Sequence, residues 1–213
     1  MRAPSLVLAS ASPARLVTLE RAGLAPEVEV SGVDESTIHA DTVPALVAAL
    51  ARAKAEAVAT RRTSVDGRDS ELVVIGCDSL LELDGIGLGK PADAADAVRR
   101  WQLMRGRSGV LHTGHHLVRL PGGASRTATA STTVHFADLD DAEIAAYVGT
   151  GEPLLVAGAF TIDGLGGPYV ERIEGDHHNV VGISLPLVRR LLADLGVSWS
   201  ELRNHAGSAP STF

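Results

Sequence analysis

The sequence has a single cysteine, few aromatic residues and no surplus of positive charge. One cysteine, Cys77, excludes a framework of disulfide bonds within the chain. Aromatic residues make up only 3% of the 213 residues and hydrophobic residues 45%, so we expect a core built from Ala, Val, Leu and Ile. The net charge of −7 argues against a general nucleic-acid-binding or membrane-binding surface, because either needs a broad basic patch.

Long apolar segments are missing as well. No run is long enough for a membrane-spanning helix, and the amino terminus carries no charged and then apolar leader. We therefore expect a soluble, cytoplasmic protein whose partners are neither membranes nor nucleic acid. The length fits one compact domain, expected over residues 1–205, while residues 206–213 are expected to be a disordered tail. A polyanionic substrate would need a locally basic cleft.

The pattern near the amino terminus predicts a strand, a tight turn and a helix. An apolar run over residues 6–9 is followed by Ser10 and Ser12; Ser12 is a good N-cap, and Pro13 suits the first helical position. Free backbone N–H groups and the helix dipole at such a corner favour an anion, most often phosphate, with Arg15 one turn away. Capping and turn formation alone would also explain these serines, so the local pattern leaves both interpretations open.

A second helix is predicted over residues 44–62, which are rich in alanine and carry an apolar stripe at helical spacing. Lys54 lies at the edge of that stripe. Such a lysine ordinarily covers the apolar face with its stem while its ammonium reaches water. Before this helix, residues 27–30 alternate like a half-exposed strand and lead into Glu35, an acid typical of a solvated loop.

Residues 72–77 form a continuous apolar run that predicts a central strand covered on both faces. The run stops at Asp78 and Ser79, and a carboxylate at the carboxyl end of a buried strand lies where open α/β sheets bind ligands. Strand character then continues to a hairpin signal at residues 84–85. Lys90 follows in a Gly-Lys-Pro turn that lacks Walker A spacing; it is either an ordinary exposed lysine or a cation beside the site.

Residues 109–136 predict two long strands around a Pro-Gly-Gly turn, so the sheet is expected to be mixed. Four histidines fall on these strands: His112, His115, His116 and His135. Neither their spacing nor the surrounding residues match a zinc motif, and neighbours on a strand point to opposite faces. We therefore expect no zinc site there.

These motifs, in this order, resemble the Maf family of nucleoside triphosphate pyrophosphatases. The matching segments are S-x-S-P-x-R at the first turn, A-R-x-K-A in the second helix, C-D-S after the central strand, G-K-P, and the closing stretch at residues 175–186. Together they span residues 5 to about 195. The resemblance implies a mixed α/β fold in which helices flank a twisted central sheet and two lobes surround a cleft.

The resemblance also implies hydrolysis of a nucleoside triphosphate to a monophosphate and pyrophosphate. Asp78 would accept the proton of the attacking water and, with Glu35, hold a divalent cation, Mg²⁺ or Mn²⁺. Seven residues would contact the substrate: Ser10, Ser12, Arg15, Lys54, Ser79, Lys90 and Asp163. Three positions sort substrates in the family: relative to the thymidine/uridine branch, Ala14 replaces Arg, Ser79 replaces Thr and Asp163 replaces Gln.

Two points stay open at this stage. The family has also been connected with arrest of septum formation, so a nucleotide-binding regulator of cell division with little turnover is the alternative to an enzyme. The joint presence of Asp78, Lys54 and Lys90 favours the enzyme, because binding alone needs no carboxylate beside a polyphosphate. The family often forms dimers, which leaves a homodimer open.

Overall fold

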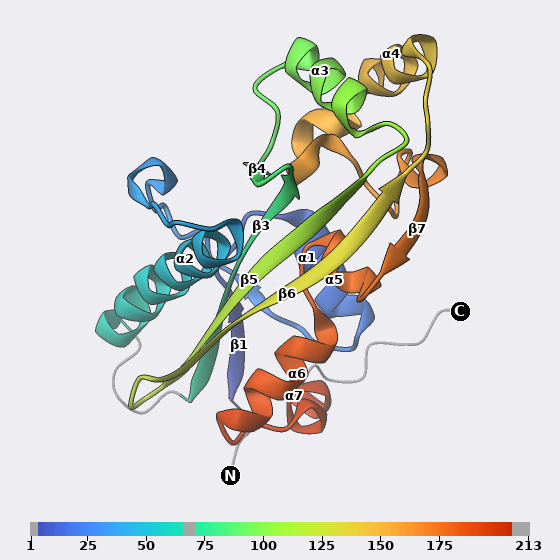
Figure 1. The fold of residues 1–213 in the computed structure, drawn as a ribbon. Helices are drawn as coiled ribbons and strands as arrows, with labels where there is room; N and C mark the ends of the chain where they lie inside the picture. The colour runs from blue at the N-terminus through green and yellow to red at the C-terminus, as the bar shows by residue number, and fades with distance from the viewer. Residues whose placement is uncertain (1–3, 66–70, 206–213) are drawn as a thin grey trace.

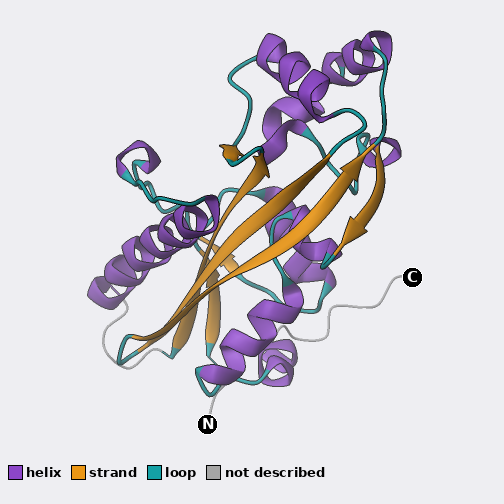
Figure 2. Cartoon of the chain, in the orientation of Figure 1, coloured by secondary structure: helices purple, strands orange, loops and turns teal. Residues whose placement is uncertain are grey.

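The computed structural model describes residues 4–65 and 71–205, which form one mixed sheet with helices on both faces (Figures 1 and 2). The strands are β1 (Ser5–Leu8), β2 (Glu27–Val28), β3 (Leu72–Leu83), β4 (Ile86–Leu88), β5 (Ser108–Leu120), β6 (Ala124–Phe136) and β7 (Val170–Glu174). The α-helices are α1 (Pro13–Arg21), α2 (Val43–Val65), α3 (Ala94–Met104), α4 (Asp141–Gly149), α5 (His177–Val181), α6 (Leu185–Asp194) and α7 (Trp199–His205). Short 3₁₀ helices in the described ranges are η1 (Glu35–Thr37), η2 (Glu152–Leu155), η3 (Ala157–Ala159) and η4 (Gly167–Tyr169).

The strand order β2-β1-β3-β5-β6-β7, with β4 paired to β3, confirms the predicted mixed α/β fold. β1 runs parallel to β2 and β3, whereas all other pairs are antiparallel. As predicted, strand character continues beyond Asp78: β3 has 12 residues and ends at Leu83, just before the expected hairpin. On one edge of β3, the four-residue strand β1 pairs only as far as Ile75. On the same edge, pairing with β4 begins at Leu81. Between these two points, no described strand pairs with this edge of β3.

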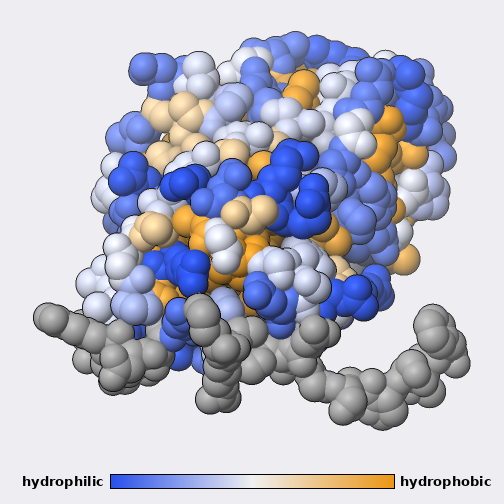
Figure 3. Space-filling view, turned by 90° about the horizontal axis from the view of Figure 1, so that it is seen from below, coloured by the Kyte–Doolittle hydropathy of each residue, from blue (hydrophilic) through white to orange (hydrophobic). Residues whose placement is uncertain are grey.

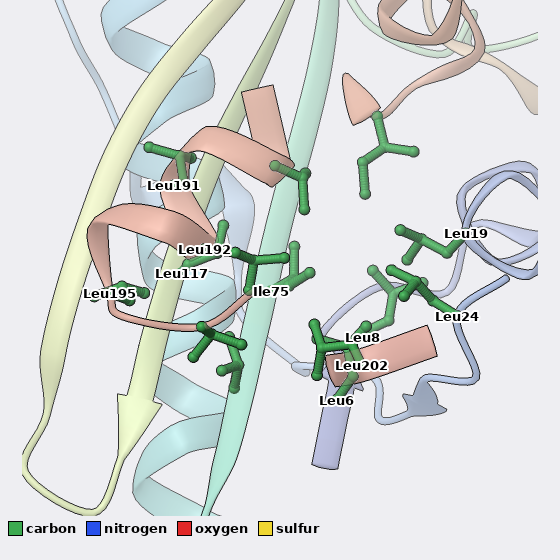
Figure 4. Packing of buried hydrophobic residues seen from close by; sticks show 14 of the residues in the cluster. Leu6, Leu8, Leu19, Leu24, Ile75, Leu117, Leu191, Leu192, Leu195 and Leu202 are labelled. Carbon is green, nitrogen blue, oxygen red and sulfur yellow. The ribbon is translucent and has the colours of Figure 1, made fainter. Parts of the chain in front are cut away.

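Two apolar clusters cover the faces of the lower part of the sheet. On one face, Leu8, Ile75 and Leu117 pack against Leu192 and the other leucines of α1, α6 and α7 (Figure 4). On the other face, small and β-branched residues of α2 pack against β1, β3 and β5, as shown by the cluster of Ala55, Val58, Val74 and Val118. These clusters agree with the predicted aliphatic core.

A third cluster lies at the other end of the sheet, where α3 and α4 pack together (Figure 1). The expectation of a purely aliphatic core is wrong there. Trp101 contacts the rings of Phe136, Tyr147 and Tyr169, with centroids 5.7, 5.5 and 5.9 Å away, and Phe136 contacts Phe160 at 5.0 Å. Aromatic residues are few, but most of them gather in this lobe, where their large buried areas can hold a small core together.

Helix α2 approaches the sheet closely because two strand residues that face it are glycines. A Cβ at Gly76 would overlap the carbonyl oxygen of Ala51, and one at Gly114 would overlap that of Val47. The backbone of an alanine-rich helix therefore lies directly on β3 and β5. This packing brings Lys54, on α2, over the middle of β3.

Side-chain oxygens cap three of the helices. Asp93 caps α3, Asp140 forms a capping box with Glu143 on α4, and Ser198 caps α7 through Glu201. Strand β2 is shorter than predicted and ends at Val28. No helix in the described ranges has the length and hydropathy needed to cross a membrane. In the view of Figure 3, hydrophobic residues appear in several groups between hydrophilic ones. The tail predicted at residues 206–213 lies outside the described residues.

Candidate active site

Several of the predicted site residues lie along the edge of β3 between its pairings with β1 and β4. Asp78 and Ser79 occupy this stretch, and strand alternation directs their side chains to opposite faces. Ser10 follows the end of β1 on one side. Lys90 follows β4 on the other, just after Gly89, which lies against the side chain of Leu80. The turn after β1 and the turn after β4 thus lie on either side of Asp78 and Ser79, the two positions predicted from the sequence.

Lys54 joins two carboxylates on the α2 face. Its ammonium nitrogen lies 2.5 Å from Asp78 Oδ1 and 2.8 Å from Glu35 Oε1. The side chains of Lys54 and Asp78 are only 11% and 12% exposed, whereas that of Glu35 is 52% exposed. The interpretation of Lys54 as a lysine whose ammonium reaches into water is therefore wrong. Three of the predicted site residues form one ion-pair cluster, open to solvent on the Glu35 side.

Arg15 lies on the opposite face and is 8% exposed. Its Nε donates to the carbonyl oxygen of Gly182 at 2.8 Å, and Nη1 donates to Ser10 Oγ and to the Cys77 carbonyl oxygen, both at 2.9 Å. Nη2 donates to Ser79 Oγ at 3.0 Å. Four of the five N–H groups of a guanidinium are thus engaged by the protein. Arg15 ties the first turn, the open edge of β3 and the end of α5 together, and one N–H is left for a ligand.

The first turn uses Ser10 rather than Ser12 as its internal acceptor. Ser10 Oγ accepts hydrogen bonds from Arg15 and, at 3.2 Å, from the backbone N–H of Ser12. Ser12 occupies the N-cap position before Pro13, as predicted, but its side chain makes no capping hydrogen bond. No side chain in the described part of the chain caps the first N–H groups of α1, and an anion site at a helix start requires such free groups.

A family model described as "Maf-like protein" matches residues 5–195, the same range over which the motifs occur. The chain belongs to the Maf family. A relative from Salinispora tropica is 60% identical over 207 residues, covering 97% of this chain and 91% of the relative. Another from Streptomyces coelicolor is 58% identical over 197 residues, covering 92% and 93%. A third from Synechocystis sp. is 50% identical over 195 residues, covering 92% and 96%. Each relative is named nucleoside triphosphate pyrophosphatase.

Glu35 and Asp78 are the residues of this Maf protein that could hold a divalent cation. Their oxygens converge on one cationic position, which the Lys54 ammonium occupies here. No group of three or more His, Cys, Asp or Glu side chains suited to a metal occurs in the part of the chain that the structure describes. Two carboxylates fit Mg²⁺ or Mn²⁺ nonetheless, because such ions are often bound by one or two carboxylates, with waters and substrate phosphates completing the shell.

Asp163 lies in the loop between η3 and η4, and its side chain is exposed. No hydrogen bond or ion pair joins its carboxylate to another described residue. The segment is nevertheless connected to the site: Gly158 donates its backbone N–H to the carbonyl oxygen of Gly89 at 3.0 Å, beside Lys90. The loop that carries Asp163 therefore starts from a contact with the Gly-Lys-Pro turn. Lys90 itself is exposed.

Ser79 is held by a hydrogen-bond network whose members were not predicted from the sequence as site residues. Ser79 Oγ shares a hydrogen bond of 2.9 Å with Thr113 Oγ1, which donates to the Asn179 carbonyl oxygen at 3.3 Å. His115, dismissed as a zinc ligand, instead accepts the backbone N–H of Ser184 on Nε2 at 2.9 Å, and its Nδ1 lies 3.0 Å from the Thr113 carbonyl oxygen. The only signal for this network was the closing motif around residues 175–186, since the partners come from distant strands and helices.

Acid is expected to destabilise the protein through His115. Burial, reinforced by the charge of Arg15, lowers the pKa of His115 to about 4, while an exposed histidine titrates near 6.5. Below pH ~6.5 the unfolded chain therefore binds a proton that the folded chain excludes. The contribution of the neutral ring to the free energy of unfolding is complete above pH ~6.5 and is lost towards pH ~4. Between about pH 7 and about pH 5, the loss should be on the order of 2 kcal/mol.

Urea unfolding at both pH values measures this loss. In the variant His115→Gln, which cannot titrate, the free energy of unfolding should fall less between the two pH values than in the wild type. Equal losses in both proteins would show that another group carries the acid sensitivity.

Proposed function

We propose that this chain hydrolyses nucleoside triphosphates to nucleoside monophosphates and pyrophosphate, with Asp78 orienting or deprotonating the water that attacks the α-phosphorus. One observation carries the proposal: the buried cluster of Lys54 and Asp78 lies at the open edge of β3, between the first turn and the Gly-Lys-Pro turn. Membership of the Maf family and the shared name of the relatives support the same activity.

Within this site the two oxygens of Asp78 have different tasks. Oδ1 accepts from the Lys54 ammonium, which fixes the carboxylate in place. Oδ2 has no partner among the described residues and can accept a hydrogen bond from water, as a general base must. The carboxylate is held by α2 and β3, both rigid elements, so the direction of proton transfer is set before substrate binds.

The positively charged groups around Asp78 bind the triphosphate. Lys90 and the free N–H groups at the start of α1 bind phosphate oxygens, and Lys54 neutralises charge that develops as the bond to the leaving pyrophosphate breaks. Arg15 holds Ser10 and Ser79 in position and offers its remaining N–H. A divalent cation held by Glu35 and Asp78 would supply further charge neutralisation and polarise the phosphoryl oxygens.

The bond that breaks distinguishes this reaction from that of an ordinary phosphatase. Attack at the α-phosphorus should release one pyrophosphate per nucleotide, whereas attack at the terminal group releases orthophosphate and a diphosphate. Product analysis by ion-exchange chromatography, with Mg²⁺ or Mn²⁺ and a panel of nucleotides, makes the distinction. Diphosphate and orthophosphate as products would overturn the proposal. Binding without turnover of any nucleotide would favour the regulator instead.

Asp163 is proposed to read the base. A glutamine amide both donates and accepts hydrogen bonds, but an ionised carboxylate only accepts and repels a base edge lined with carbonyl oxygens. Nucleotides whose bases present N–H donors, such as guanine, cytosine or modified bases, should therefore be hydrolysed at least as efficiently as dTTP and UTP. The variant Asp163→Gln should shift kcat/KM towards dTTP and UTP by on the order of tenfold.

A matched control for charge is Glu171→Gln, which removes an exposed carboxylate from β7 in the same lobe. It should leave the ratio of kcat/KM values unchanged. A wild-type enzyme already selective for dTTP and UTP, with a selectivity that Asp163→Gln does not move, would show that Asp163 has no part in reading the base.

A further inference from the structure

Glu152, at the start of η2, is the centre of a hydrogen-bond cluster that the reaction described above does not use. Its Oε1 accepts from the hydroxyl of Tyr147 at 3.0 Å, from Thr161 Oγ1 at 2.5 Å and from the backbone N–H of Gly166 at 3.0 Å. Its Oε2 accepts from the backbone N–H of Leu165 at 2.9 Å. Three of these four donors belong to residues 161–166, on both sides of Asp163.

The loop over residues 161–166 is shaped to fit around this carboxylate. A Cβ at Gly164 would collide with Glu152 Oε2, and one at Gly166 would collide with the Tyr147 hydroxyl. Glycine at both positions lets the backbone approach closely enough to donate its N–H groups. Tyr147 also donates to Glu152 and accepts the backbone N–H of Thr161 at 3.2 Å, so the loop is held at several points.

The anchor beneath the loop is rigid. Tyr147 is 2% exposed, and the centroid of its ring lies 5.5 Å from that of Trp101, within the aromatic cluster between α3 and α4. Burial acts to raise the pKa of Glu152, but hydrogen bonds from Thr161, Leu165, Tyr147 and Gly166 outweigh it and lower the pKa below its ordinary value. Glu152 is therefore an ionised acceptor, and hydrogen bonds to a charged acceptor are stronger than those to a neutral one.

We propose that Glu152 is a positioning residue for base selection: its carboxylate fixes the 161–166 loop and thereby the place from which Asp163 meets the nucleotide base. This inference rests on the proposed function, because it assigns the support of the same base-reading residue. Asp163 has no hydrogen-bond or ion-pair partner of its own among the described residues, so its position depends on the backbone that carries it. Glu152 accepts two of this backbone's N–H groups, from Leu165 and Gly166, and also the hydroxyl of Thr161.

The test is the variant Glu152→Gln in the full chain. The amide keeps the size of the side chain but places an NH₂ group where the carboxylate accepted donors, so the contacts to Leu165 or Gly166 must break. Hydrogen exchange of the backbone N–H groups of Leu165 and Gly166, read by NMR without nucleotide, should be at least about tenfold faster. The ratio of kcat/KM for GTP over dTTP should change several-fold, through KM more than kcat, with pyrophosphate still the product.

Two milder variants keep the test valid if Glu152→Gln folds poorly. Thr161→Val and Tyr147→Phe each remove one donor to Glu152 with little change of shape, and each should change exchange and selectivity in the same direction but less. Glu152→Asp, which retains the carboxylate, should recover part of both. The control Glu143→Gln removes a carboxylate that, among the described residues, accepts the N–H of Asp140 in the α4 capping box and no donor of the 161–166 loop, and it should change neither.

The outcomes separate this proposal from the proposed function. Unchanged exchange at Leu165 and Gly166 in Glu152→Gln would overturn the anchor, and this readout needs no turnover. Faster exchange with an unchanged selectivity ratio would make Glu152 a structural residue only and would overturn the positioning role. If Asp163→Gln shifts selectivity and Glu152→Gln does not, the base-reading role of Asp163 stands while this inference fails.

Discussion

Replacing Asp78 with Asn is expected to lower kcat by roughly 100-fold or more, because the amide cannot take a proton from the attacking water. Binding of the triphosphate should persist or improve, since a negative charge beside a polyanion has been removed. The hydrogen bond that Lys54 now donates to Oδ1 can be kept by the amide oxygen, so the fold should be little affected. Steady-state kinetics and nucleotide-binding calorimetry measure the two effects separately.

Glu82→Gln is the matched control for Asp78→Asn. Glu82 lies on the same strand and the same face, four residues further on, and its carboxylate pairs with His112 Nε2 at 3.0 Å rather than with Lys54. This variant should keep turnover within a few-fold of the wild type, a small effect beside the factor of about 100 expected for loss of a general base. Turnover of Asp78→Asn near the wild-type level would remove Asp78 from the mechanism.

The sequence was sufficient to predict the strands and helices that surround Asp78, but not the contacts that define its surroundings. An apolar run followed by a carboxylate indicated a buried strand at a ligand site, and the order of motifs indicated the family. Lys54 was ambiguous because helical periodicity places a lysine at the edge of a stripe without saying what lies opposite. Its partners, Glu35 and Asp78, come from a 3₁₀ helix and a strand that only the tertiary fold brings together.

The role of Arg15 was hidden for the same reason. Next to a helix N-terminus, an arginine suggests a phosphate contact, yet four of its N–H groups are engaged by oxygens of residues 10, 77, 79 and 182. The sequence around Glu152 contains no sign of its role. A Gly-Glu-Pro sequence after a helix is typical of a turn, and no local pattern indicates that residues 161–166 donate hydrogen bonds to its carboxylate. Long-range hydrogen bonds of single polar side chains leave no periodic pattern in a sequence.

The close approach of α2 to the sheet makes Gly114 the position where a small substitution should have a large effect on stability. Replacing a strand glycine with alanine usually stabilises, because the unfolded chain loses freedom. At Gly114 the added Cβ would overlap the carbonyl oxygen of Val47 and lie 2.6 Å from the backbone nitrogen of Ala48. Backbone atoms cannot swing aside, so α2 must shift away from β5. We expect Gly114→Ala to lower the free energy of unfolding by about 3 kcal/mol, the upper end for overpacking.

Gly149→Ala separates this overlap from the general effect of removing a glycine. Gly149 is the last residue of α4, and a Cβ there would meet no atom within 4 Å, so urea unfolding should show this variant to be at least as stable as the wild type. The shift of α2 in Gly114→Ala should also carry Lys54 away from Asp78 and lower kcat in the protein that remains folded, because the ion pair spans the same interface. Wild-type stability of Gly114→Ala would contradict the close packing of α2 on the sheet. Lost stability with full activity would show that the Lys54 and Asp78 pair does not depend on it.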